Sequence, residues 1–482
     1  MRRAYPFVSA ALLLAACSST SSSSSTGTGG THASSSTGTG AGVGTGGATP
    51  DAGADAPADA IDDVPVTPPP DGSITNPCDL PGSVQFTASG TVTVPGGAPT
   101  APTLAFLHLP VGYCAHYYGT VGNARQLRFS PGTSDLFVAS PTALTTGGNG
   151  GAGKSAILVL PDANMDGNAD APSTFLSNLP STQGLLFAGS FFYYQDGTKI
   201  MRVPYAAGDL LPGAASEQIA DLSLNGQYQD GLHWPKTLDV ADDGTIYVGN
   251  GGDQGETCVQ PHPFRGGIYS IDPAPGAHPA GIQVAQGLRN PIAVRCRKGN
   301  NTCFALELAK DYTAGAGGRE KMLQIHQGDD WGFPCCATTG LPYTQTVTQN
   351  GMTPNCSTVA TEINSFVIGD TPFGLDFEMN HWSGTFGGRA FVATHGAAGS
   401  LVGARIVAIP IDASTGLPTA STDLSGTGTP GPDMGMLDFA TGWDDSTFTH
   451  GRPASLAFHP DGRLFVGNDN NGVIFWIAQI AQ

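Results

Sequence analysis

The chain has 482 residues and a formal net charge of −19, and only 12% of its residues are charged. This acidic balance argues against nucleic acid as a partner, because nucleic-acid binding needs a basic face. Glycine and proline are abundant, at 68 and 37 residues, and apolar residues seldom recur at helical spacing. The sequence therefore predicts an all-β protein with many tight turns.

The N-terminus carries the features of an export signal. A basic start, Met1-Arg2-Arg3, precedes a short apolar run that ends in Leu-Ala-Ala-Cys17, which is typical of a signal peptide. This ending is similar to the lipobox of bacterial lipoproteins, which implies removal of residues 1–16 and a lipid on Cys17. Ser18, in place of an aspartate, then favours the outer membrane. The alternatives are an ordinary secretory signal with an accidental cysteine, or an uncleaved leader.

Residues 17–77 contain almost no large apolar side chains, so they cannot bury enough surface to offset the entropy of ordering. We expect a disordered tether, stiffer in its proline-rich part at residues 67–70. No later apolar stretch is long enough for a transmembrane helix. The globular part is expected at residues 78–482, which exceeds the usual size of one core and suggests two domains or a repeat architecture.

A β-hairpin phrase recurs through this region. Each copy has a strand of alternating polarity, a tight turn with glycine, and a second such strand. Six copies predict a six-bladed β-propeller, with a β-sandwich as the alternative. The clear copies are residues 127–139, 238–248 and 456–466, and the weaker ones are 187–200, 292–306 and 373–394.

Nine cysteines are present, and eight remain if Cys17 is lipidated. An even number in an exported chain favours disulfides over free thiols. Cys296 and Cys303 flank a turn-rich stretch, so we expect a bridge there, while adjacent Cys335 and Cys336 should bond elsewhere. The other pairings stay open. A metal site is the rival interpretation, but no C-x-x-C pair with a matching histidine supports it.

Loops at one end of a propeller channel converge, so their polar residues are candidates for a site. His233 precedes the third hairpin and could act as a general base, or simply stack on Trp234. Arg289 and Asn290 form a rigid corner with a proline. The arginine could hold a carboxylate or stabilise an oxyanion, or be a solvated turn residue.

Two further segments stand out. The loop at residues 328–334 is rich in aromatic residues and proline, and its paired carboxylates, Asp329 and Asp330, could bind a hard cation or face water. Gln183, in the segment at residues 181–187, could bond a ligand or cap the end of a blade.

The order of these segments resembles the glucose/sorbosone dehydrogenase family of pyrroloquinoline quinone (PQQ) enzymes, which are six-bladed propellers. The resemblance covers about residues 120–470. Its motifs are Gln-Gly-Leu-Leu at 183–186, His233 before a hairpin ending in Gly-Asp-Gln-Gly at 252–255, Gly-x-Arg-Asn-Pro at 287–291 and the loop at 328–334. Thr-His-Gly at 394–396 and Gly-Arg-Pro at 451–453 are similar to the sorbosone branch.

The resemblance implies an activity: PQQ-dependent oxidation of an aldose or related sugar at the anomeric carbon. His233 would take the hydroxyl proton while a hydride passes to the quinone, and Arg289 would stabilise charge on the quinone oxygens. Asn290, Gln183 and Arg405 would contact cofactor or substrate. Electrons would pass to a respiratory acceptor that the residues do not identify.

The resemblance also implies a Ca²⁺ ion, which the family holds with carbonyls of a Gly-Pro pair. The corresponding stretch here, residues 307–311, has neither residue. Glu307, Asp311 and Glu320 are the remaining candidate ligands. The acidic residue that precedes the base in the best-known members is Leu232 here. Two alternatives therefore stay open: a non-catalytic propeller that binds a carbohydrate or protein at the cell surface, and a metal-dependent lactonase.

Overall fold

The computed structural model describes residues 76–141, 154–225, 233–252, 258, 266–274, 279–309, 320–343, 354–367, 369–397, 401–419, 436–445 and 447–481. Residues 61–482 form one unit of the chain. All described residues belong to this unit. The expected signal peptide, Cys17 and the tether up to residue 75 lie outside them.

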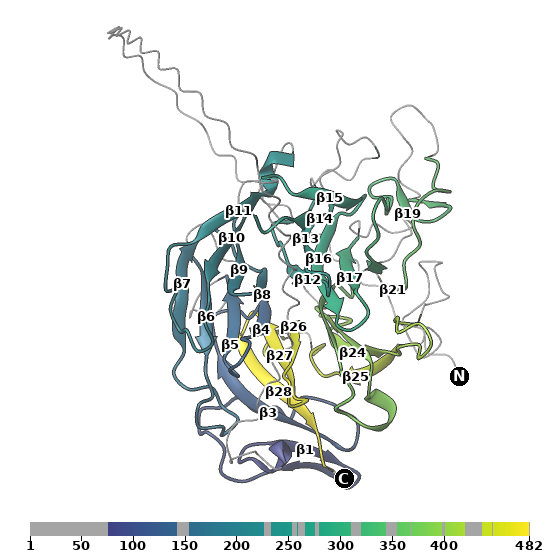
Figure 1. Cartoon of the computed structure of the whole chain (residues 1–482). Coiled ribbons are helices and arrows are strands. Elements are labelled where there is room, and N and C mark those ends of the chain that lie inside the picture. Colours follow the sequence, from purple (N-terminus) through teal and green to yellow (C-terminus); the bar gives the residue numbers. More distant parts are fainter. Residues whose placement is uncertain are drawn as a thin grey trace, which may run out of the picture. The chain divides into compact units, whose positions relative to one another are not determined.

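Six antiparallel sheets surround a central axis, which confirms the propeller (Figure 1). In each blade the chain runs from the innermost strand outward. Blade 1 holds β4 (Gln126–Phe129), β5 (Leu136–Ser140), β6 (Ser155–Leu160) and β7 (Ser173–Leu179). Blade 2 holds β8 (Leu185–Ala188), β9 (Phe191–Asp196), β10 (Lys199–Pro204) and β11 (Glu217–Asp221). Blade 3 holds β12 (Leu238–Val240), β13 (Ile246–Asn250), β14 (Gly267–Ile271) and β15 (Ile282–Gln286).

The second half of the ring repeats this plan. Blade 4 holds β16 (Asn290–Arg297), β17 (Thr302–Leu308), β18 (Glu320–Gln324) and β21 (Asn364–Phe366). Blade 5 holds β22 (Pro372–Phe377), β23 (Ala390–Thr394), β24 (Arg405–Ile409) and β25 (Leu437–Ala440). Blade 6 holds β26 (Arg452–Phe458), β27 (Leu464–Asp469), β28 (Val473–Gln479) and β3 (Tyr113–Thr120), extended by β1 (Val84–Thr87) and β2 (Gly90–Thr93).

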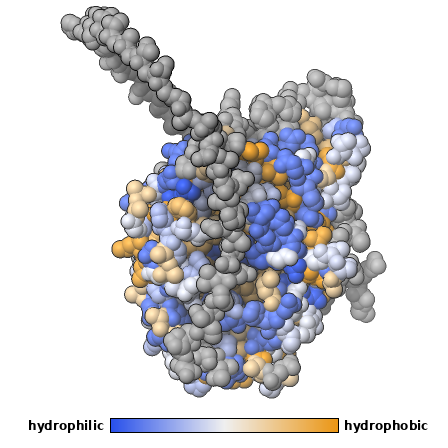
Figure 2. Space-filling view, viewed as in Figure 1, coloured by the Kyte–Doolittle hydropathy of each residue, from blue (hydrophilic) through white to orange (hydrophobic). Residues whose placement is uncertain are grey.

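The remaining elements are short. β19 (Cys336–Thr338) and β20 (Leu341–Pro342) form a small separate ribbon. The 3₁₀ turns are η1 (Pro77–Asp79), η2 (Leu222–Asn225) and η3 (Gly384–Phe386). Within the described part of the chain, no helix is long and apolar enough to span a membrane. On the face shown in Figure 2, hydrophilic residues predominate and hydrophobic residues occur in small separate groups.

The ring is closed by strands from both ends of the described chain. β3 pairs with β28 along its length, with Ala115 opposite Ile477. This pairing covers the outer edge of β28 and removes the open edge that an incomplete ring would expose. The Cys78–Cys114 disulfide attaches the segment before β1 to β3. Trp476 of β28 is fully buried and donates from Nε1 to the carbonyl of Gly167 in blade 1, so it also joins neighbouring blades.

Apolar side chains fill the space between successive blades. Blades 1 and 2, for example, share a buried cluster around Phe137 and Phe192, and blades 4 and 5 share one around Phe304 and Phe377. Each of the six predicted hairpins contributes the inner strands of one blade. The strands could be predicted because successive side chains of a strand point to opposite faces, which gives the sequence a period of two.

Four disulfides are formed by the eight cysteines of the globular part. The predicted Cys296–Cys303 bridge is confirmed, and it joins directly opposed residues of β16 and β17. Adjacent Cys335 and Cys336 bond elsewhere, as expected, to Cys258 and Cys356. These last two bridges brace the loop at residues 328–343 from two sides.

Replacing Trp476 with alanine should lower the free energy of unfolding by about 3–5 kcal/mol, because it leaves a cavity at the junction of blades 6 and 1. Urea denaturation followed by circular dichroism measures this change. Leu211→Ala is the matched control, because Leu211 is 64% exposed, and its midpoint should match the wild type. A Trp476→Ala midpoint equal to that of the control would contradict the role of Trp476 in closure.

Candidate functional site

The predicted site residues lie at the beginning of inner strands. Gln183 precedes β8, His233 precedes β12, and Arg289 and Asn290 stand at the start of β16. Because each blade has four antiparallel strands, the chain returns to the same end of the ring before every inner strand. These residues therefore share one mouth of the central channel. Gln183 also reaches across it, since its Nε2 donates to the carbonyl of Ile292 in blade 4 at 3.4 Å.

His233 and Arg289 are connected through one glycine. His233 Nδ1 lies 3.0 Å from the carbonyl oxygen of Gly252, and the Gly252 amide donates to the carbonyl of Arg289 at 2.7 Å. A carbonyl can only accept, so Nδ1 carries the hydrogen and Nε2 is the basic nitrogen of the neutral ring. A Cβ at Gly251 would approach the carbonyl oxygen of His233 to 2.4 Å, so this packing requires glycine.

Glu307 holds the turn that carries Arg289. Its Oε1 accepts from the Arg289 amide at 2.9 Å, and its Oε2 lies 3.5 Å from Lys321 Nζ. The carboxylate is fully buried, and burial raises the pKa of Glu307 while Lys321 opposes the shift. Lys321 Nζ also donates to the carbonyl of Trp331. Glu307, a candidate metal ligand in the sequence, is therefore committed to positioning Arg289.

Glu320 is committed in a similar way. It is buried, its carboxylate accepts from the Thr371 amide, and burial together with the charge of Asp370 raises its pKa to about 8. Glu320 therefore carries a proton at neutral pH. Asp311 lies outside the described residues. Within the described ranges, no group of three or more His, Cys, Asp or Glu side chains is arranged to hold a metal ion.

Arg405 lies apart from this group. It is the first residue of β24, the third strand of blade 5, and so lies two strands out from the innermost strand, β22. Its Nη2 pairs with Asp370 at 3.0 Å and its Nε with Asp438 at 3.0 Å. Arg405 thus joins β24 to the loop before β22 and to β25.

A buried charged cluster at the mouth was not anticipated. Arg125 Nη2 pairs with Asp469 Oδ2 at 2.9 Å, and His395 Nε2 lies 3.2 Å from the same oxygen. Arg452 donates to the carbonyls of His395 and Gly396. Burial lowers the pKa of His395 to about 3 and that of Arg452 to about 10. Burial alone would raise the pKa of Asp469, but Arg125 and His395 outweigh it and hold it below its usual range.

A sequence signal for this cluster existed. Arg125 stands directly before the inner strand of its blade, as Arg289 does in blade 4. His395 and Arg452 belong to the two motifs that resemble the sorbosone branch, although that resemblance gave them no role. Aligning the six blade starts with one another would have marked Arg125 and Arg452, because each stands at the start of an inner strand.

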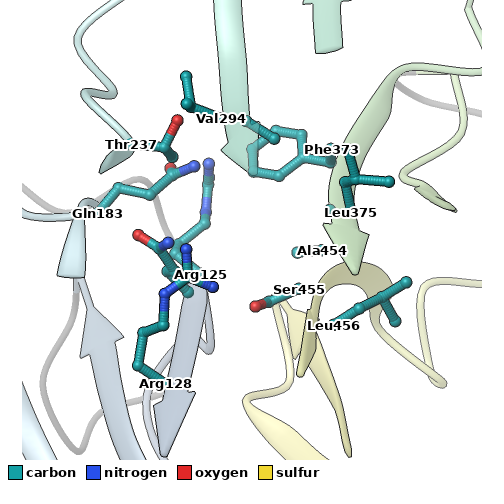
Figure 3. A pocket seen from close by; sticks show the side chains of 13 residues that line it. Arg125, Arg128, Gln183, Thr237, Val294, Phe373, Leu375, Ala454, Ser455 and Leu456 are labelled. Carbon is teal, nitrogen blue, oxygen red and sulfur yellow. The ribbon is translucent and has the colours of Figure 1, made fainter. Parts of the chain in front are cut away.

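A cavity opens between the inner strands, and all six blades line it. The polar side chains of Arg125, Arg128, Gln183 and Thr237 face a wall that is apolar except for Ser455, formed by Phe373, Leu375, Ala454 and Leu456 (Figure 3). Two buried oxygens at this end of the channel, Gln183 Oε1 and Asn290 Oδ1, have no hydrogen-bond partner within the described part of the chain. Buried acceptors without partners are costly, and both would be satisfied by hydroxyl or N–H groups of a ligand.

Within the inner strands, four charges from different blades form what we call the axial ion ring: Arg128, which also lines the cavity, Asp239, Arg295 and Asp376. Arg295 bridges the two carboxylates, at 3.2 Å to Asp239 and 2.8 Å to Asp376. Arg128 Nη2 lies 3.8 Å from Asp239 and donates to the carbonyl of Leu238. Two positive and two negative charges balance, so the ring needs no further ion.

The sequence contains one more loop whose oxygen-bearing side chains are spaced as in a calcium site, and it was not predicted. Residues 162–170 read D-x-N-x-D-G-x-x-D, similar to the oxygen spacing of calcium loops. In this structure the side chains serve the loop itself: Asp162 Oδ1 accepts from the Asp166 amide, and Asp170 Oδ2 from the Ala163 amide. The Ala169 amide donates to the carbonyl of Tyr118, so the loop fastens blade 1 to the closing strand β3.

No family model matches the sequence, and no curated protein matches it. Solved structures share its fold. A calcium structure of the family AA12 carbohydrate-active enzyme of Trichoderma reesei aligns with a TM-score of 0.60 and 17% identity, covering 80% of this chain and 98% of that one. The holo PQQ domain of pyranose dehydrogenase from Coprinopsis cinerea aligns with a TM-score of 0.59 and 14% identity, covering 79% and 98%.

A third match comes from a bacterium. The apo form of the soluble aldose sugar dehydrogenase of Escherichia coli aligns with a TM-score of 0.53 and 11% identity, and covers 76% of this chain and 99% of that one. At such identities the likeness establishes the propeller fold, and the chain spans nearly the full length of these proteins. Functional residues must be argued from the site itself.

Glu320→Gln should flatten the dependence of stability on pH. The pKa of Glu320 rises from its ordinary value of 4.5 to about 8 on folding. The folded state therefore holds a proton that the unfolded state releases, and the free energy of unfolding falls as pH rises from about 4.5 to about 8. A glutamine cannot ionise, so the variant should gain stability over the wild type as pH rises.

Urea denaturation at pH 5, 6.5 and 8 measures this difference. Glu217→Gln is the control, because Glu217 is an exposed residue of β11, and its curve should follow the wild type. A constant gap between wild type and Glu320→Gln at all three pH values would contradict the protonated state of Glu320.

Proposed function

We propose that this protein oxidises an aldose or related sugar at the anomeric carbon with PQQ as the hydride acceptor. The observation that carries the proposal is the connection of His233 to Arg289 through Gly252 at the channel mouth. Its support for the proposal is that His233 and Arg289 belong to adjacent backbone segments, and a base and a cation are the pair that hydride abstraction from a hydroxyl carbon needs. The fold is shared with a PQQ domain of pyranose dehydrogenase and with an aldose sugar dehydrogenase.

The described residues fit an anionic quinone at this mouth. PQQ carries three carboxylates and ring carbonyls, and Arg289 would neutralise charge on them. Gln183 Oε1 and Asn290 Oδ1, buried acceptors without partners in the described part, would receive the N–H of the cofactor or hydroxyls of the sugar. When bound, PQQ supplies the oxidising power by accepting a hydride.

The described carboxylates do not fit a Ca²⁺ ion. Glu307 is held by Lys321 and the Arg289 amide, and the buried Glu320 carries a proton. A calcium ion would have to use Asp311 or carbonyl oxygens of the neighbouring loop, which lie outside the described residues. We therefore assign no step to calcium.

In the proposed reaction, His233 Nε2 accepts the proton of the anomeric hydroxyl as the hydride leaves the same carbon. The contact of Nδ1 with the Gly252 carbonyl fixes the ring and its tautomer, so the basic nitrogen, Nε2, keeps one orientation. Glu307 and Gly252 fix the backbone of Arg289 on both sides. Its guanidinium then stabilises negative charge with little reorganisation. Gln183 orients the substrate or the cofactor across the channel.

We also propose an exported location. Four disulfides in the described part are typical of an oxidising compartment. The N-terminal motif supports a lipid on Cys17 and a tether that holds the propeller away from an outer membrane. Electrons would then pass to a respiratory acceptor outside the cytoplasm.

His233→Ala should lower sugar-dependent dye reduction by about 10²–10⁴-fold, because the general base is lost. The purified chain, supplied with PQQ and a panel of aldoses, gives the measurement. His326→Ala is the control, because the His326 side chain is 57% exposed, and it should keep full activity.

Three outcomes separate the alternatives. Activity that survives His233→Ala contradicts the assignment of the base. A wild-type protein that neither binds PQQ nor reduces the dye would favour a non-catalytic binding propeller. Hydrolysis of a lactone with a divalent metal and no quinone would favour a lactonase.

A further inference from the structure

The cluster at the channel mouth contains an excess of buried positive charge. Arg125 and Arg452 are both cationic, and Asp469 is the carboxylate between them. His395 is buried against the same carboxylate and is neutral at physiological pH. Two positive charges and one negative charge leave one positive charge unbalanced. Among the described residues, Arg125 has no ion-pair partner except Asp469, and Arg452 has none.

The neighbouring carboxylates are committed to other cations. Asp370 pairs with Arg405, which also pairs with the solvent-exposed Asp438. Glu307 pairs with Lys321, and Asp239 and Asp376 belong to the axial ion ring. Glu320 is protonated at neutral pH. The excess charge at Arg125 and Arg452 is therefore not offset from the adjoining elements that the structure describes.

Arg125 directs this charge into the cavity. Its guanidinium lies 5.1 Å from the ring centre of Phe373 and 5.9 Å from that of Trp234, so two aromatic faces hold it in place. Its side chain is 9% exposed and lines the cavity (Figure 3). Its Nε is buried and has no hydrogen-bond partner in the described part. Arg452, in contrast, donates to two backbone carbonyls.

An unbalanced buried guanidinium with an unused donor is costly unless an anion occupies the space in front of it. A guanidinium binds carboxylates through two parallel hydrogen bonds, which matches the planar fork of arginine. Beyond Phe373 the cavity wall, with Leu375, Ala454 and Leu456, is apolar, so we expect an anion that carries an apolar body.

We propose that Arg125 binds a carboxylate of a ligand inside the channel mouth, with Trp234 and Phe373 holding its guanidinium in position. This inference rests on the proposed function for the identity of the ligand. The carboxylate belongs either to the quinone cofactor or to an acidic sugar such as a uronic acid, and the two sources can be distinguished by experiment.

The first measurement is the affinity for PQQ in the absence of sugar, by isothermal titration calorimetry on the full chain. Arg125→Gln removes the charge and keeps a polar side chain, while Arg125→Lys keeps the charge without the fork. A cofactor carboxylate predicts a Kd about 10–100-fold higher for the glutamine variant and a smaller loss for the lysine variant. Arg202→Gln, which breaks a surface ion pair with Glu217, is the control and should leave the Kd unchanged.

The second measurement compares kcat/KM for glucuronate and for glucose in PQQ-loaded protein. A substrate carboxylate predicts that Arg125→Gln lowers kcat/KM for glucuronate at least about tenfold more than kcat/KM for glucose, and does not change the PQQ Kd. Near-UV circular dichroism establishes that each variant is folded.

A third measurement does not depend on the proposed function. Pyridine-2,6-dicarboxylate, a planar aromatic dicarboxylate, is titrated into the wild type and Arg125→Gln. If PQQ fails to bind but this probe binds and loses affinity in Arg125→Gln, the carboxylate site stands and only the proposed function is overturned. A folded Arg125→Gln variant that matches the wild type for PQQ, for the two sugars and for this probe overturns the inference.

Discussion

The axial ion ring is the interaction on which the rest of the molecule depends. A propeller needs few contacts between opposite blades, yet Arg128, Asp239, Arg295 and Asp376 join blades 1, 3, 4 and 5 across the axis, and Asp376 also accepts from the Phe458 amide of blade 6. The ion pairs of Arg295 raise its pKa despite burial, so the ring stays charged. Because breaking such a network leaves buried charges without partners, it fixes the spacing of the inner strands.

That spacing determines what the channel can hold. The ring lies within the inner strands, where Arg128 also lines the cavity, and Gln183, His233 and Arg289 lie at the mouth, before the inner strands begin. Ionic groups therefore occur in two layers that differ in net charge. The layer that holds the blades together is neutral, and the layer at the mouth has an excess of positive charge. Arginine serves both layers. Arg128 of the ring lies in β4, and Arg125 at the mouth directly precedes that strand.

The hairpins and one disulfide could be predicted because their causes are local: alternating strands around a glycine turn, and two cysteines on either side of such a turn. The convergence of Gln183, His233 and Arg289 followed from their positions before inner strands. The partners of Arg125 could not be predicted, because Asp469 and His395 come from blades at the far end of the sequence. Residue type also could not reveal that Arg405 begins a third strand, nor that Glu307 faces Lys321 and the Arg289 amide.

Closure by β3 and β28 has a consequence for the order in which the fold can be completed. β28 (residues 473–479) follows every other strand of the propeller, while its partner β3 precedes the first blade. The ring can therefore close only once the last of these strands has been made. A chain truncated before residue 473 would leave β27 and β3 each with an open edge, and open strand edges are sites at which chains pair with one another. The Cys78–Cys114 bridge would hold β3 in place in such a chain but could not replace its partner strand.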